Sequence, residues 1–335
     1  MAVLMATTKT TTNTTNSLIF SPSPLSRGFL FIGTYMSEEY DYDVAYIDAD
    51  VLVYHAAFGA QKTYYDLKRV SDEDFLETHS SAKDVKARKE ELEDFFMADE
   101  GEFYYTPREF LREESDALAC CDNLIEKIKD RVVARKYVYY LTGQGNYREK
   151  VATLKKYKGD RPPKPHYYAA VKRHLISVYK AVVVEGVEAD DAVAVGMSVQ
   201  IRKGKKGIAC SIDKDLLNVP GHHYGWKRDE FYVVSEYEAN IFLYQQIMAG
   251  DPVDNYAGIP RVGPATAAKL LNGCVTERDM YEAALAAYRK KYGESYTYES
   301  WDGKQMTKTP EELLDEHAHL AYIMRRKDQR WTRPE

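Results

Sequence analysis

The sequence AVVVEGVEADDAVAVG (residues 181–196), followed by IACSIDKDLL (208–217), decides the fold. It reads as an apolar strand, a turn, a helix, a second apolar strand and a second turn, and a unit of this length predicts parallel strands. Ligands of open parallel sheets bind at the carboxyl ends of the strands, where carboxylates repel one another unless a cation such as Mg²⁺ holds them. Both turns carry such carboxylates: Glu188, Asp190 and Asp191, then Asp213 and Asp215.

Further strands are expected on either side of this unit. VAYID (44–48) ends on Asp48, KYVYYLTG (136–143) ends on Gly143, and FYVVS (231–235) follows the central unit. Residues 71–135 are highly charged with helical spacing, and 114–133 form the clearest amphipathic helix. The sequence therefore predicts an α/β protein with a parallel sheet flanked by helices.

The chain divides into three parts by composition. Residues 1–43 are rich in Ser and Thr, and we expect a disordered or non-native extension there, with an organelle transit peptide as the alternative. Residues 44–249 form the expected α/β domain. Residues 250–335 form an expected helical region, whose last helix begins with a capping box at Thr309 and Glu312. No apolar run is long enough to span a membrane.

A basic strip beside the acids suits a phosphodiester substrate. The whole chain has 46 basic and 52 acidic residues, but residues 148–180 carry 10 bases against 2 acids. Within YKGDRPPKP (157–165), Lys158 and Arg161 are three apart, so on a helix both would face one way, towards a phosphate. The sequence predicts helices on both sides of the proline break; a solvated basic surface is the alternative.

A glycine-rich hairpin is expected in GDPVDNYAGIPRVGPATAAKLL (250–271). Gly258 and Gly263 would let the main chain approach phosphates, and Pro264 would open a helix with free N–H groups. Arg261 and Lys269 can add phosphate contacts, while Asp251 and Asp254 can extend the acid pocket. An ordinary helix–turn–helix is the alternative interpretation.

A different enzyme class also matches part of the chain. YIDADVLVY (46–54) fits the nucleophile motif of haloacid-dehalogenase-type phosphatases, with Asp48 as nucleophile and Asp50 as general acid. That interpretation leaves the central acids, the basic strip and the glycine hairpin unexplained.

Taken together and in this order, the motifs resemble the 5′-nuclease superfamily of flap endonucleases and 5′→3′ exonucleases, most of all the exonucleases of short-tailed bacteriophages. The resemblance covers roughly residues 44–275. It implies a PIN-like or resolvase-like sheet, a helical arch at about 144–180 and a C-terminal helix–three-turn–helix that binds duplex DNA, with a K⁺ ion.

The resemblance also implies site residues. Two Mg²⁺ or Mn²⁺ ions would bind the acid pocket, made of Asp48, Glu188, Asp190, Asp191, Asp213, Asp215, Asp251 and Asp254. Tyr157, Lys158 and Arg161 would act on the phosphate from the arch. DNA would contact Gly258, Arg261, Gly263, Thr266 and Lys269.

The expected activity is metal-dependent 5′→3′ exonuclease or 5′ flap endonuclease cleavage of DNA, or of RNA in RNA–DNA hybrids, in replication, repair or phage degradation of DNA. A monomer in the cytoplasm of a bacterium or of a phage-infected cell is expected. Similar proteins carry a further metal-binding Asp where this chain has Gly143 or Gln144. The departure leaves open a third hypothesis, a DNA-end-binding protein with a weakened active site.

Overall fold

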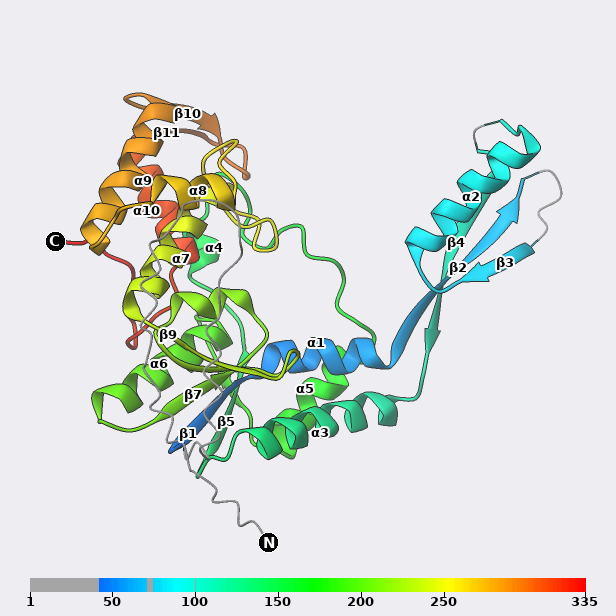
Figure 1. Cartoon of the computed structure of the whole chain (residues 1–335), viewed down its shortest axis with the longest axis horizontal. Helices are drawn as coiled ribbons and strands as arrows, with labels where there is room; N and C mark the ends of the chain where they lie inside the picture. Colours follow the sequence, from blue (N-terminus) through cyan, green and yellow to red (C-terminus); the bar gives the residue numbers. More distant parts are fainter. Residues whose placement is uncertain (1–41, 71–74, 100) are drawn as a thin grey trace, which may run out of the picture. The chain divides into compact units, whose positions relative to one another are not determined.

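A six-stranded, mostly parallel sheet organises the chain (Figure 1). The computed structural model describes residues 42–70, 75–99 and 101–335. The strand order is β6-β5-β1-β7-β8-β9, and only β9 runs antiparallel to its neighbour. The strands are β1 (Val44–Asp48), β5 (Tyr137–Thr142), β6 (Val182–Val184), β7 (Gly207–Cys210), β8 (Gly221–Gly225) and β9 (Glu230–Val234). The predicted α/β parallel sheet is confirmed, and β8 is a strand that the sequence did not indicate.

Helices pack on both faces of this sheet, as the alternation along β1 shows. Ala45 and Ile47 enter a core shared with α1 (Ala49–Gly59), α3 (Glu114–Arg131) and α5 (Tyr168–Ser177). Tyr46 points to the opposite face, into a core shared with α6 (Ala189–Arg202). Because successive side chains of a strand alternate between faces, one apolar strand serves both layers.

The first turn of α6 fixes the position of the central acids. Glu188 is the N-cap of the helix, and a capping box joins its side chain to the N3 residue, Asp191. A capping box satisfies backbone N–H groups that would otherwise lack partners. The helix therefore starts directly beyond the end of β6, with Glu188, Asp190 and Asp191 at the edge of the sheet.

Between α1 and α3 the chain forms a second, three-stranded sheet with one helix packed on it. β2 (Gln61–Arg69) pairs with both β3 (Phe75–His79) and β4 (Phe103–Leu111), and α2 (Ala82–Phe96) packs on them. The expectation of helices through 71–135 is thus wrong for β3 and β4, although α2 and α3 are helical. Leu67, Val85 and Phe103 form a small separate core, and such long-range strand pairing overrides local helical spacing.

The basic strip is mainly irregular, so the helical-arch prediction is wrong in its first half. Only α4 (Arg148–Val151) and α5 are helical between residues 144 and 180. Lys158 lies in a turn with a positive φ of 56°, so the helical face assumed for Lys158 and Arg161 does not exist. Pro162, Pro163 and Pro165 remove backbone donors and hold this segment extended.

A second large core belongs to the C-terminal part of the chain. It joins α7 (Glu236–Ala249), α8 (Pro264–Leu270), α9 (Glu277–Tyr292) and α10 (Pro310–Ala321), and includes Tyr157 from the basic strip. A hairpin of β10 (Tyr296–Glu299) and β11 (Gln305–Lys308) lies between the last two helices. The predicted capping box at Thr309 is confirmed. No helix of the described residues is long and apolar enough to cross a membrane.

Candidate metal-dependent active site

Acidic side chains at two neighbouring strand ends are joined by hydrogen bonds at one edge of the sheet. Asp48 ends β1, and its carboxylate accepts a 3.0 Å hydrogen bond from the Ser211 hydroxyl, just after β7. The Asp213 N–H donates to the same hydroxyl at 3.0 Å. Asp213 in turn accepts from the backbone N–H of Asp215 at 2.9 Å, at the start of the 3₁₀ helix η1 (Lys214–Asn218). Four residues thus link the ends of β1 and β7 into one hydrogen-bonded edge.

Four of these acids have no close cationic partner; we call them the weakly paired acids. They are Asp48, Asp190, Asp213 and Asp215. Among the described residues the first three form no ion pair, and Asp215 has only a 3.9 Å contact with the Lys214 amine. Burial, together with repulsion from Asp50 and Asp213, raises the pKa of Asp48 to about 8. Burial, with repulsion from Asp213 and Asp251, raises the pKa of Asp215 to about 7.

The same causes raise the pKa of Asp190 and of Asp213. Burial is the largest for both, followed for Asp190 by the neighbouring charges of Asp191 and Glu188. Carboxylates in such surroundings strongly disfavour their charged form unless a cation joins them.

Another four acids are held by basic side chains; we call them the paired acids. They are Glu188, Asp191, Asp251 and Asp254. Asp191 is the most fully engaged, because Arg148 forms a bidentate ion pair with it at 2.7 and 2.9 Å. Its carboxylate also accepts from the backbone N–H groups of Met324, at 3.0 Å, and Glu188, at 3.1 Å. Burial acts to raise the pKa of Asp191, but Arg148 holds it below its ordinary value.

Arg148 itself is buried and binds the end of the chain to the site. Besides Asp191, its guanidinium donates to the carbonyl oxygens of Leu320, at 3.1 Å, and Tyr322, at 2.7 Å. The sequence analysis missed this role, since Arg148 is one of ten bases in the strip and nothing local distinguishes it. The geometry makes Asp191 a structural partner of Arg148, and its role as a metal ligand stays a prediction.

The three residues expected to act on the phosphate do gather at the acids. The Tyr157 hydroxyl donates to Glu188 at 3.0 Å and to Asp254 at 2.7 Å. The Lys158 amine bonds to Glu188 and lies 3.6 Å from Asp254, and Arg161 donates to Asp254 at 3.0 Å. Desolvation opposes the charge of Lys158, but Glu188 and Asp254 raise its pKa above the ordinary value. The predicted grouping is therefore present without the predicted helix.

Asp251 has a basic partner that the sequence analysis did not identify. The Lys214 amine donates to the buried Asp251 carboxylate at 2.6 Å. Lys214 lies between the two predicted ligands Asp213 and Asp215 in the chain, so its proximity to Asp251 depends on the meeting of η1 and the loop after α7.

The fit of these residues to a divalent cation depends on which oxygen atoms they offer and on the charges around them. As the side chains stand, the described residues contain no group of three or more His, Cys, Asp or Glu arranged around one ion position. Lys158 and Lys214 instead lie among the carboxylates. The weakly paired acids, however, supply several hard oxygen donors whose charges lack compensation, which is the donor set that Mg²⁺ or Mn²⁺ prefers. The residues thus fit such an ion.

The loop between α7 and α8 is built around close backbone contact. Gly258 has φ 59°, and a Cβ there would lie 2.3 Å from the backbone nitrogen of Gly250. Glycine is therefore required here by conformation and by space. The Ile259 N–H donates to the Met248 carbonyl oxygen at 2.7 Å and closes the loop onto the end of α7.

Most of the predicted DNA-contacting residues line the exposed side of this loop and of α8. Four of the five are exposed (Arg261, Gly263, Thr266 and Lys269), and neither of the two bases forms an ion pair with a described residue. The fifth, Gly258, is buried against the backbone at the end of α7, so its part is to shape the loop. Leu271 is buried and anchors the end of α8 in the core, whereas Leu270 is 41 % exposed. At seven residues α8 is too short to carry the helix-dipole argument for anion binding.

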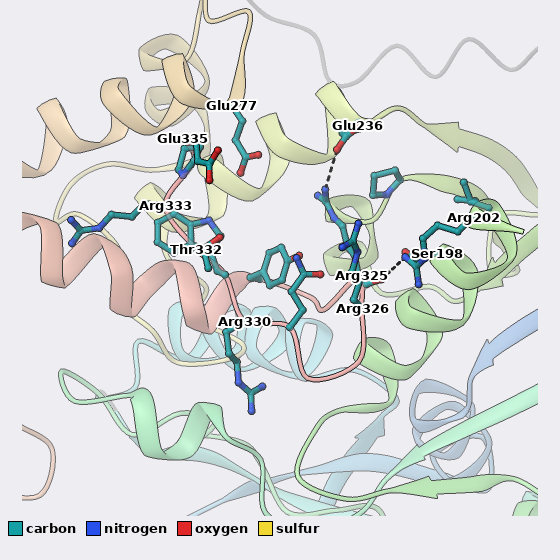
Figure 2. A pocket seen from close by; sticks show the side chains of 16 residues that line it. Ser198, Arg202, Glu236, Glu277, Arg325, Arg326, Arg330, Thr332, Arg333 and Glu335 are labelled. Carbon is teal, nitrogen blue, oxygen red and sulfur yellow. Dashed lines mark hydrogen bonds and ion pairs between the residues drawn. The ribbon is translucent and has the colours of Figure 1, made fainter.

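A cavity of about 550 Å³ lies elsewhere, against the C-terminal segment (Figure 2). Figure 2 shows Arg202, Arg325 and Arg326 gathered at one end, with Arg325 near Glu236. None of the predicted site residues lines this cavity. The size of a cavity is therefore a poor guide to the chemistry of this chain.

Comparison with known proteins agrees with the sequence motifs. No family model matches the chain. A curated 5′-3′ exonuclease of Buchnera aphidicola (subsp. Acyrthosiphon pisum) is 26 % identical over 170 residues, covering 46 % of this chain and 58 % of that protein. The resemblance to the 5′ nucleases is confirmed by this match. The chain thus aligns with little more than half the length of that relative.

Solved structures of similar proteins include T5 5′-exonuclease with bound zinc and bacteriophage T5 flap endonuclease in a complex with DNA and metal ions. The first is 15 % identical with a TM-score of 0.36, covering 50 % of this chain and 79 % of that one. The second is 11 % identical with a TM-score of 0.38, covering 84 % and 99 %.

Proposed function

We propose that this protein is a divalent-metal-dependent 5′ nuclease that hydrolyses phosphodiester bonds of DNA. One observation carries the proposal: the Tyr157–Lys158–Arg161 group bonds to Glu188 and Asp254, and the charges of Lys158 and Asp254 act on the weakly paired Asp213 at the carboxyl edge of the parallel sheet. An acidic pocket beside fixed cations suits a substrate that is itself anionic. The similarity to a protein named 5′-3′ exonuclease supports the polarity.

Asp48, Asp190, Asp213 and Asp215 would hold the cation or cations, and Glu188, Asp251 and Asp254 would complete the pocket. When bound, Mg²⁺ or Mn²⁺ would lower the pKa of water and stabilise charge on the reacting phosphate. Two ions are proposed because the acids are spread over the ends of β1, β6 and β7 and the loop after α7.

The chain's own cations would bind and orient the phosphate. Lys158 and Arg161 remain charged at neutral pH, and 40 % of the Arg161 side chain is exposed, so its guanidinium can reach an incoming phosphate. Arg can bind two phosphate oxygens at once, and Lys adds a point charge. Tyr157 would keep Glu188 and Asp254 at a fixed separation while these cations engage the substrate.

Duplex binding would use the loop before α8 in a helix–three-turn–helix arrangement. Gly258, Arg261, Gly263, Thr266 and Lys269 would contact the DNA backbone, with K⁺ bound at the turn. Backbone contacts carry no sequence information, so binding should be sequence-independent and weaken with salt. The proposal includes 5′ ends, 5′ flaps and RNA–DNA hybrids as substrates, a monomeric enzyme and a cytoplasmic location in a bacterial or phage-infected cell.

The phosphatase alternative is not favoured. Asp48 is only 3 % exposed, and its carboxylate is already bonded to Ser211 and to the Asp50 N–H, which suits a ligand of a buried ion better than a nucleophile. The Asp50 carboxylate accepts from the Thr142 N–H at 3.2 Å, which gives it a structural role beside the site.

A cleavage time course tests the proposal. Linear duplex, a 5′-flap duplex and an RNA–DNA hybrid, each labelled at one 5′ end, are incubated with Mg²⁺ or with EDTA, using wild type and Asp213→Asn. Early release of short labelled products, lost with EDTA and in the variant, is expected. Intact substrate in every lane with a retained gel shift would instead identify a DNA-end-binding protein.

A further inference from the structure

Gly143 and Glu185 lie side by side, just beyond the ends of the neighbouring strands β5 and β6. Thr142 of β5 pairs with Val184 of β6, so the residues that follow them lie side by side. A Cβ added to Gly143 would lie 2.4 and 2.6 Å from the two carboxylate oxygens of Glu185. The Glu185 carboxylate therefore fills the volume that a side chain at 143 would need.

The backbone does not demand glycine at this position. Gly143 is absent from the residues with positive φ, and its conformation is open to any L-residue. A side chain at position 143 is thus excluded by the Glu185 carboxylate, which reaches from the end of β6 to the end of β5.

The carboxylate is fixed in place but lacks a cation. The Gln144 N–H donates to it at 2.6 Å, and the Gly186 N–H donates back to the Gln144 carbonyl oxygen at 2.8 Å. Within the part of the chain that the structure describes, no basic side chain forms an ion pair with Glu185. Glu185 is exposed, so its carboxylate oxygens are open to a hard cation or to one of the cation's water molecules.

Thr142 links the end of β5 to the acid pocket. Its N–H donates to Asp50, which adjoins the end of β1, and its hydroxyl accepts at 2.9 Å from the N–H of Ala189, between Glu188 and Asp190. Thr142 thus joins β5 to the first turn of α6. Glu185 directly follows Val184, the residue of β6 that pairs with Thr142.

We propose that Glu185 is a further ligand of the metal site, binding the ion directly or through one of its water molecules. The inference rests on the proposed metal-dependent function, and Mg²⁺ commonly keeps several waters in such sites. Glu185 would supply from β6 the carboxylate that Gly143 cannot supply from β5.

Mn²⁺ binding, measured by electron paramagnetic resonance without substrate, tests this role. Glu185→Gln keeps the size of the side chain and an acceptor for Gln144, and about tenfold or greater loss of Mn²⁺ affinity is expected. Glu294→Gln, at an exposed acid without a described partner, is the matched control and should bind as wild type does.

A swap sharpens the test. Gly143→Asp alone should fail to improve binding because its side chain meets Glu185, whereas Gly143→Asp combined with Glu185→Gly should recover most of the affinity lost in Glu185→Gly. Thermal melting of each variant shows that it is folded.

The outcomes separate this inference from the proposed function. Wild-type affinity in Glu185→Gln, with affinity lost in Asp213→Asn, would overturn the role of Glu185 alone. Absence of Mn²⁺ binding by the wild-type protein would overturn both.

Discussion

The weakly paired acids and the paired acids lie at the same sheet edge but differ in what offsets their charge. Asp190 and Asp191 are neighbours in the chain, yet Asp191 has Arg148 and two backbone donors, whereas Asp190 has no ion pair among the described residues. Charge pairing thus separates acids that build the site from acids that remain available to a cation. A buried ion pair is costly to break, while an uncompensated carboxylate favours a ligand.

The largest expected effect comes from removing a weakly paired acid. Asp213→Asn should reduce DNA cleavage by about 10³-fold or more, because a carboxylate that binds the metal contributes several kcal/mol to the transition state. Single-turnover kinetics measures the loss, and a gel shift shows whether DNA binding is retained. Asp130→Asn, at an exposed acid of α3, is the control; equal activity in both variants would contradict a role of Asp213 in cleavage.

Removing the partner of a paired acid should instead destabilise the fold. Arg148→Met leaves Asp191 buried without its counter-charge, and we expect a loss of about 3–5 kcal/mol in the free energy of unfolding. Chemical denaturation measures the loss. The double variant Arg148→Met/Asp191→Leu removes both charges and should recover part of the stability. A double variant no more stable than Arg148→Met would contradict a mainly electrostatic cause.

Lys158 differs from the other partners of the paired acids, because it neutralises Glu188 and Asp254 and is also proposed to meet the phosphate. Lys158→Met should lower the single-turnover rate by about 10²–10³-fold at saturating enzyme, the loss typical of one fixed electrostatic contact. Lys155→Met, in the same basic strip but exposed, should leave that rate near the wild-type value. A rate loss in both variants would show a general charge effect.

The smallest effect concerns pH in the absence of metal. The folded-state pKa values of Asp48, about 8, and Asp215, about 7, lie above the ordinary value of 3.8, so the folded protein binds more protons than the unfolded chain. The stability contributed by these groups is complete below the ordinary pKa and is lost as pH rises through the folded values.

In EDTA, we expect the free energy of unfolding to fall by more than about 1 kcal/mol between pH 6 and pH 8. Added Mg²⁺ should reduce this fall, and Asp48→Asn/Asp215→Asn should flatten it. Stability that rises over this interval in EDTA would contradict the assigned surroundings of both acids.

The sequence by itself determined the parallel sheet and the position of its acids. Asp48 ends one apolar strand, and Glu188 and Asp213 follow the ends of two others, so the geometry of parallel strands alone brings them to one edge. The capping box at Thr309 was equally local, because it depends on residues three apart.

Only the tertiary structure decided which acid has which partner. Arg148 reaches Asp191 across 43 positions, Lys214 reaches Asp251 across 37, and Glu185 fills the space at Gly143 across a strand pair. The irregular strip around Lys158 and the strands β3 and β4 likewise follow from distant packing. Such contacts depend on where separate elements meet in space, and the spacing of residues within one segment of sequence does not predict them.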